Sequence, residues 1–234
     1  MTDAPALTRE HGPRERIAYL HGFGSGPGST KGRALGAAFD AAGRHLDRLD
    51  LNRPSFSELT FTAALSAVDD WYSNDPDPGS PVALIGSSLG GYLAARWAEL
   101  NPTAVRALVL LCPGLDMAHR WPALIGAPAM ARWRETGWLP LPDARGTPTP
   151  IHWHFIEDAL THPPLPRPTC PTLVVHGTRD ALVPIEGSRA WVASLADARL
   201  IEVDDVHELH ANMPRIISET LGFLAPPQRP PAHR

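Results

Sequence analysis

The sequence has few cysteines, no excess of positive charge and no long apolar run, and each of these shortages excludes a class of protein. Only two cysteines occur in 234 residues, so the fold does not depend on a disulfide framework. The formal net charge of −4 offers no basic surface for nucleic acid. No apolar stretch approaches the length of a transmembrane helix. We therefore expect a protein that neither binds nucleic acid nor spans a membrane.

The amino-terminal region and the cysteines indicate a compartment. Residues 1–16 are polar and contain no apolar stretch, which predicts neither a signal peptide nor a transit peptide. Cys112 and Cys170 lie beside expected strands, and we interpret them as reduced, partly buried thiols, with a single bridge between them left open. These features predict a cytoplasmic protein. The sequence leaves its oligomeric state open.

Short apolar runs alternate with helical patterns, which predicts an α/β fold with a mostly parallel sheet of about six strands flanked by helices. With 43% hydrophobic and 20% charged residues, the chain can bury a large core. The expected strands cover residues 16–20, 45–51, 82–85, 106–112, 172–176 and 199–203. The expected helices cover residues 30–42, 59–72, 88–100, 185–195 and 207–224.

Residues 113–171 separate the fourth and fifth expected strands, and this segment is too long for a crossover connection and too apolar for a disordered linker. It holds four of the seven tryptophans, namely Trp121, Trp133, Trp138 and Trp153. We predict an inserted helical cap here, with short helices over 122–136 and 152–160. The core domain is then discontinuous and consists of residues 1–112 and 172–225. The proline- and arginine-rich residues 226–234 predict a disordered tail.

A glycine-flanked serine stands at the junction of an expected strand and an expected helix. The motif Gly-Ser-Ser-Leu-Gly occupies residues 86–90, directly after the apolar run 81–85 and at the start of a helical pattern. A G-x-S-x-G motif in this position is typical of a nucleophile elbow, in which a sharp turn exposes the central serine, here Ser88. The five residues alone are a weak signal, and their placement between strand and helix carries the prediction.

A serine hydroxyl needs a base to remove its proton and a carboxylate to orient that base. Asp180 follows the strand expected at 172–176 and is the predicted acid, with Asp116 as a weaker substitute. His207 follows the last expected strand and is the predicted base, in preference to His210. Both predicted partners lie at the carboxyl edge of the sheet, where Ser88 is also expected.

Two backbone N–H groups are predicted to form the oxyanion hole. One belongs to Leu89, the residue after the nucleophile, and the other belongs to Phe23 in the loop after the first strand. His21 and His176 each precede a glycine at a strand end, and we expect them to brace loops by hydrogen bonds. No metal-binding spacing and no complete phosphate-binding or dinucleotide-binding loop occurs, so no metal or cofactor is expected.

At these residues the chain resembles the α/β-hydrolase superfamily, and the resemblance extends over residues 16–224. Residues 19–25, 29–31 and 86–92 resemble the small bacterial YqiA-like esterases. The segment 155–159 and the stretches 176–184 and 205–207 are similar to a mitochondrial abhydrolase that acts as an acyl-glucuronide esterase and a palmitoyl-protein thioesterase. The resemblance implies an α/β-hydrolase fold and a serine hydrolase, but it says little about the substrate.

The predicted function is hydrolysis of a small apolar-acyl carboxylic ester through an acyl-enzyme, by a triad of Ser88, Asp180 and His207. The four cap tryptophans Trp121, Trp133, Trp138 and Trp153 are the predicted walls of the acyl pocket. Two alternatives stay open. The same machinery would serve an acyl thioesterase acting on acyl-protein or acyl-CoA, and an α/β-hydrolase fold can also be a catalytically silent binding module.

Overall fold

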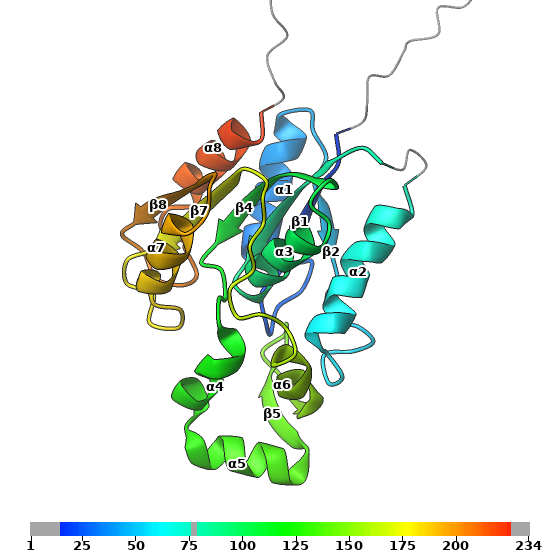
Figure 1. Cartoon of the computed structure of the whole chain (residues 1–234), viewed down its shortest axis with the longest axis vertical. Coiled ribbons are helices and arrows are strands. Elements are labelled where there is room, and N and C mark those ends of the chain that lie inside the picture. The colour runs from blue at the N-terminus through cyan, green and yellow to red at the C-terminus, as the bar shows by residue number, and fades with distance from the viewer. Residues whose placement is uncertain (1–14, 76–78, 226–234) are drawn as a thin grey trace, which may run out of the picture.

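The computed structural model describes residues 15–75 and 79–225, so the tail predicted at 226–234 lies outside the described residues. One six-stranded parallel sheet forms the centre of the molecule, with the strand order β2-β1-β3-β4-β7-β8 (Figure 1). Its strands are β1 (Ile17–Leu20), β2 (Asp47–Leu49), β3 (Val82–Ser87), β4 (Val105–Leu111), β7 (Thr172–Gly177) and β8 (Ala198–Val203). The predicted α/β class and strand number are therefore confirmed.

Helices cover both faces of this sheet (Figure 1). α1 (Thr30–Ala41) and α8 (Met213–Phe223) pack on one face, and α2 (Phe61–Ser73), α3 (Leu89–Leu100) and α7 (Ile185–Ala193) pack on the other. The central strands β1, β3, β4 and β7 are buried on both sides, whereas the edge strands β2 and β8 are partly exposed. Alternate residues of a central strand enter different apolar clusters: Leu84 packs with α3, whereas Ile85 packs with α1. Continuous apolar strands of this kind are typical of parallel sheets.

The last helix begins later than the sequence predicts. The expected helix over 207–224 is observed as α8, which starts at Met213, so His207 lies in a loop and not at a helix start. The physical reason is Asp205, whose carboxylate accepts hydrogen bonds from the N–H groups of Val206 and Asn212 and folds the segment into a loop. Leu209 also has a positive φ of 58°, which a helix cannot contain.

Residues 113–171 fold into three helices and a hairpin at the lower end of the view in Figure 1. The helices are α4 (Met117–Ile125), α5 (Ala127–Thr136) and α6 (His154–Ala159). Between α5 and α6, β5 (Trp138–Pro142) pairs antiparallel with β6 (Pro148–His152). The sequence predicts only helices here, so the hairpin is a correction to the expected helical cap.

The prolines made this hairpin hard to predict from the sequence, because proline cannot donate a hydrogen bond to a strand ladder and therefore argues against a strand. The register pairs Pro140 with Pro150 and Pro142 with Pro148. At the end of the ribbon, Asp143 N–H donates to Thr147 O. Since ladder hydrogen bonds in an antiparallel pair fall on alternate residues, the four prolines occupy the positions whose N–H would point away from the partner strand. They remove no hydrogen bond from the ribbon.

The inserted segment shares an apolar cluster with the sheet. Trp121, Trp133 and Phe155 are buried in the same cluster as residues of β1, β3, α2 and α3. Phe23, in the loop after β1, places its ring centroid 5.3 Å from that of Trp121 and 5.1 Å from that of Phe155. The segment therefore packs over the carboxyl edge of the sheet through aromatic side chains.

Candidate active site

Ser88 lies in a strained turn between β3 and α3. It has φ 54° and ψ −119°, a conformation that a non-glycine residue adopts only when its surroundings enforce it. The turn depends on the close approach of Gly90 to β1, because a Cβ at Gly90 would collide with the carbonyl oxygen of Leu20 and lie 2.5 Å from that of His21. The predicted elbow geometry is present at this serine.

Two backbone features lie beside Ser88, namely the start of α3 at Leu89 and the close approach of Gly114. Leu89 is the first residue of α3, and the N–H groups of a first helical turn have no partner within the helix. Gly114, after β4, donates its N–H to Ser88 O at 2.8 Å. A Cβ at Gly114 would lie 3.3 Å from Leu89 N and would crowd that N–H. Gly114 follows a proline and belongs to no motif, so no sequence pattern points to it.

Asp180 and His207 are in contact, although 27 residues separate them in sequence. His207 Nδ1 lies 2.6 Å from Asp180 Oδ2. Because a carboxylate only accepts, Nδ1 carries the hydrogen and Nε2 is the nitrogen left to accept a proton. The side chain of Asp180 is fully buried and that of His207 is 13% exposed. This pairing is the one that a base and its orienting acid require.

Asp180 is held ionised by its neighbours. Burial alone would raise the pKa of its carboxyl, but hydrogen bonds from His176, His207 and the Val183 N–H outweigh burial and hold the pKa well below its usual range. The Oδ1 atom accepts from the N–H groups of Leu182 at 3.0 Å and Val183 at 2.8 Å. The carboxylate therefore has a fixed orientation toward His207.

His176 lies behind this acid, and both of its ring nitrogens are engaged. Its Nε2 lies 2.8 Å from Val183 O and 3.3 Å from Asp180 Oδ2, while its Nδ1 lies 2.8 Å from Ser188 Oγ. Since a carbonyl oxygen only accepts, Nε2 carries the hydrogen. The prediction that His176 braces a loop is confirmed, and its contact with Asp180 is an addition.

His21 is the second bracing histidine. Leu51 N–H donates to its Nε2 at 3.1 Å, so Nε2 is unprotonated, and its Nδ1 donates to Gly22 O at 2.9 Å. Burial lowers the pKa of this imidazole, which agrees with a neutral ring. The predicted bracing role of His21 is confirmed.

Lys31 and Asp205 hold the loop that carries His207. Lys31 is the only lysine in the chain, and its Nζ donates to His207 O at 3.3 Å and to Glu208 O at 3.2 Å. The buried Asp205 closes the other side of the loop through Val206 and Asn212. Neither residue has a role predicted from the sequence; for Lys31 the available signal is that the chain contains no other lysine.

Neither of the two substitute residues takes part in the contact between His207 and Asp180. The half-exposed Asp116 pairs with His119 on α4, with Oδ1 2.6 Å from His119 Nδ1. His210 is exposed and lines a polar cavity of about 460 Å³ that is also lined by Ser88, His207 and Phe23. Asp180, and not Asp116, is the carboxylate that His207 contacts.

Ser88 and His207 also line a second, mostly apolar cavity of about 300 Å³, which we call the catalytic cavity. Its walls include Ser88, His207, Phe23, Gly114, Leu115, Met117, Arg120, Trp121, Leu124, Leu182 and Val183. Of the four tryptophans predicted as pocket walls, Trp121 alone lines it. Trp133 is fully buried and packs against Trp121 and Trp153, whereas Trp138 is 44% exposed beside His152.

Three buried side chains near the acid have metal-ligating atoms. Cys112 Sγ, a His176 nitrogen and an Asp180 oxygen lie within 4.8 Å of one another. Their chemistry does not fit a metal ion, because both His176 nitrogens and both Asp180 oxygens are engaged in hydrogen bonds. Burial also raises the pKa of the Cys112 thiol, whereas a ligand must be a thiolate. Cys112 and Cys170 are both buried and free, as expected for thiols that do not pair.

No helix within the described residues is both long and apolar enough to cross a membrane. Comparison with known proteins places the chain among hydrolases. The model of one family, described as "Uncharacterised protein family (UPF0227)", matches residues 16–224.

Two curated relatives match at the sequence level. The palmitoyl-protein thioesterase ABHD10 of Mus musculus is 28% identical over 222 residues, which cover 86% of this chain and 68% of the relative. A pimeloyl-[acyl-carrier protein] methyl ester esterase of Chromobacterium violaceum is 27% identical over 154 residues, which cover 52% of this chain. The matched region spans 61% of the length of that esterase.

Among solved structures, the alpha/beta hydrolase domain-containing protein 10 from mouse is similar with a TM-score of 0.71 and 23% identity. The match covers 89% of this chain and 88% of the mouse chain. A likeness at this identity shows the fold, and the fold is that of the α/β hydrolases.

Proposed function

The chain belongs to the uncharacterised protein family UPF0227, and from this membership and the geometry at Ser88 we propose that it is a serine ester hydrolase that works through an acyl-enzyme. The observation that carries the proposal is the convergence of a strained Ser88, a buried Asp180–His207 pair and an apolar cavity at one edge of the sheet. The relatives named as an esterase and a thioesterase support it.

In the proposed mechanism, Ser88 Oγ attacks the acyl carbonyl while His207 Nε2 takes the proton of the Ser88 hydroxyl. The N–H groups of Leu89 and Phe23 stabilise the oxyanion that forms. Asp180 keeps the hydrogen of His207 on Nδ1 and stabilises the imidazolium. His207 then protonates the leaving alcohol, and a water that it deprotonates releases the acid and restores Ser88.

We assign substrate recognition to the insertion, residues 113–171, and the reaction centre to the discontinuous core, residues 1–112 and 172–225. Trp121 and Met117 from α4 line the catalytic cavity, so α4 supplies most of the insertion's contact with an acyl group. Trp133 packs edge-on against Trp121, and Trp153 packs edge-on against Trp133. We assign neither Trp133 nor Trp153 a direct contact with substrate.

Thioester hydrolysis is the second candidate, and the mouse relative named as a palmitoyl-protein thioesterase favours it. The same triad serves both reactions, because each passes through an acyl-enzyme and an oxyanion. We place the reaction in the cytoplasm, a reducing compartment suited to two buried free thiols. A silent binding module is disfavoured because each triad position holds a reactive residue.

A fluorophosphonate label with a fluorescent tag tests the proposal on the whole chain. We expect stoichiometric labelling, complete loss of labelling in Ser88→Ala, and labelling near the original level in Ser87→Ala, since Ser87 lies in β3 before the turn. Hydrolysis of 4-nitrophenyl butanoate should follow the label. An unlabelled protein, or a labelled Ser88→Ala variant with unchanged turnover, would refute Ser88 as the nucleophile.

A further inference from the structure

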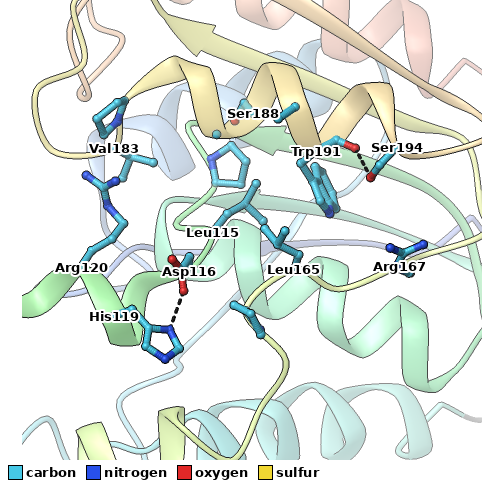
Figure 2. Close-up of a pocket in the computed structure, with 15 residues that line it drawn as sticks. Leu115, Asp116, His119, Arg120, Leu165, Arg167, Val183, Ser188, Trp191 and Ser194 are labelled. Carbon is cyan, nitrogen blue, oxygen red and sulfur yellow. Dashed lines mark hydrogen bonds and ion pairs between the residues drawn. The ribbon is translucent and has the colours of Figure 1, made fainter.

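A second cavity, of about 630 Å³, lies next to the catalytic cavity, and we call it the distal cavity. It lies between the end of β4, the start of α4, the strand-free segment before β7, and α7 (Figure 2). Its apolar lining includes Leu115, Leu165, Val183, Trp191 and three prolines, Pro113, Pro164 and Pro184. No residue predicted from the sequence to contact substrate lies in it.

The distal cavity adjoins the catalytic cavity through three shared residues. Leu115, Arg120 and Val183 line both cavities, so they form the wall between them. Of these two cavities, Ser88 and His207 line the catalytic cavity and not the distal one. A linear ligand attached at Ser88 can therefore reach the distal cavity only by passing these three side chains.

The indole and hydroxyl groups that line the distal cavity are hydrogen-bonded within the protein. Trp191 Nε1 donates to Pro166 O at 2.8 Å, and Ser194 Oγ donates to Trp191 O at 2.7 Å. Ser188 Oγ is bonded to His176. The other polar lining side chains are Asp116, His119 and Arg120, toward the lower left in Figure 2, and Arg167 at the right. The remaining lining is mostly apolar, which suits an alkyl chain better than a polar ligand.

The wall is rigid on one side and can open on the other. Val183 is fixed at both backbone groups, because its N–H donates to Asp180 and its carbonyl accepts from His176. The half-buried Arg120, from α4, is held to Leu182 O by one solvent-exposed hydrogen bond of 2.7 Å. An exposed single hydrogen bond has a small net free energy because water competes for both partners. Opening is therefore expected on the side of α4.

We propose that the distal cavity binds the far end of a long acyl chain whose carbonyl is held at Ser88, and that the Arg120–Leu182 contact controls entry to it. The inference rests on the proposed function and deepens it, since it names long-chain acyl esters or thioesters as the substrate class. Short acyl groups fill the catalytic cavity alone, whereas long ones cross the wall.

Gly187 offers a way to fill the distal cavity without disturbing the fold. It lies in α7, lines the cavity, and a Cβ built on it meets no atom within 4 Å. Gly222 in α8 is a matched control, because its Cβ also meets no atom within 4 Å and it lines neither cavity. Replacing either glycine by leucine raises helix propensity in a similar way.

The test compares kcat/KM for 4-nitrophenyl butanoate and hexadecanoate in one detergent-containing buffer. We expect Gly187→Leu to lower the hexadecanoate-to-butanoate ratio about tenfold and Gly222→Leu to leave that ratio within twofold. Arg120→Ala should raise the ratio about threefold, because long chains no longer displace a hydrogen bond. Hexadecanoyl and butanoyl thioesters of one thiol, measured in parallel, should follow the same pattern.

The proposal is overturned if Gly187→Leu leaves the ratio unchanged, or if it lowers both substrates equally. A selective loss with a hexadecanoyl-peptide thioester that is absent with a small hexadecanoyl thioester would also overturn it, because the cavity would then hold the peptide. Failure of the proposed function is distinguishable, since it is read from butanoate hydrolysis by Ser88→Ala alone.

Discussion

The carboxyl edge of the sheet and the insertion below it are held together by different forces. At the sheet edge, Ser88 is fixed by a strained backbone and a close glycine contact, and Asp180 is fixed by hydrogen bonds to both oxygens. In the insertion, Trp121, Trp133 and Phe155 contact one another through ring edges and faces. Directional contacts lose function with small displacements, whereas apolar packing tolerates changes of shape. The edge should therefore be intolerant of substitution, and the insertion tunable.

Substitution of the proposed base, His207, should cause the largest loss of kcat among the changes at the sheet edge. His207→Ala removes the histidine that contacts Asp180 and also lines the catalytic cavity beside Ser88, and we expect kcat to fall by roughly four orders of magnitude or more. His210→Ala is the control, with an expected change below about threefold, because that side chain is exposed. Steady-state hydrolysis of 4-nitrophenyl butanoate measures both. A larger loss at His210 would move the base.

Substitution of the proposed acid, Asp180, should cause the next largest loss of kcat. Asp180→Asn retains the size of the side chain but replaces a carboxylate oxygen, which accepts, with an amide NH₂ group, which donates. The hydrogen of His207 then shifts from Nδ1 to Nε2, and we expect a loss of about 10³–10⁴-fold in kcat. Asp116→Asn should change kcat little, because Asp116 pairs with His119 at the surface. Equal effects of the two substitutions would refute the assignment of Asp180.

A backbone contact provides a test of stability and not of chemistry. Gly90→Ala would place a Cβ against the carbonyl oxygens of Leu20 and His21, so we expect the free energy of unfolding to fall by about 2–3 kcal/mol. Gly222→Ala, in open space on α8, should be neutral or slightly stabilising. Urea denaturation followed by circular dichroism gives both values. A Gly90→Ala protein as stable as the original would contradict the close packing at the elbow.

The insertion should give the smallest and most selective effects. Trp121→Ala removes a wall of the catalytic cavity, and we expect kcat/KM for octanoyl esters to fall about tenfold with acetyl esters little affected. Trp121→Phe removes the indole N–H but keeps an aromatic ring, so it distinguishes the role of the ring from that of the N–H. The buried Nε1 has no hydrogen-bond partner among the described residues. Trp138→Ala, at an exposed site, should leave the octanoyl-to-acetyl ratio unchanged. A loss confined to Trp138→Ala would mean that the chain follows another path.

The same contrast decides what the sequence could predict. The strands, most helices and the elbow follow from local patterns, since apolar runs, glycine spacing and the serine motif each reflect a constraint within a few residues. The hydrogen bonds from Lys31 to the His207 loop and the close approach of Gly114 to Leu89 each join segments that are far apart in the sequence. No local pattern encodes such distances.

The insertion was harder to predict for two physical reasons. Its strands contain prolines at the positions where the missing N–H costs nothing, so the usual rule against proline in strands gave the wrong result. Its tryptophans look alike in sequence, and only packing separates Trp121, beside Ser88, from the exposed Trp138. The distal cavity escaped prediction because its walls come from α4, α7 and the segment before β7 together.

One apolar cluster runs from the sheet into the insertion without a break, and this continuity has a dynamic consequence. Phe155 of α6 lies with its ring centroid 5.4 Å from that of Phe61 of α2 and 5.1 Å from that of Phe23. Swinging the insertion away as a rigid lid would expose these rings to water. Its buried amides, such as that of Ile151, should therefore exchange hydrogen for deuterium only through unfolding of the whole molecule, as slowly as the amides of β3. Substrate would then enter by nanosecond rotations of side chains such as Arg120, and not by slow opening of a domain.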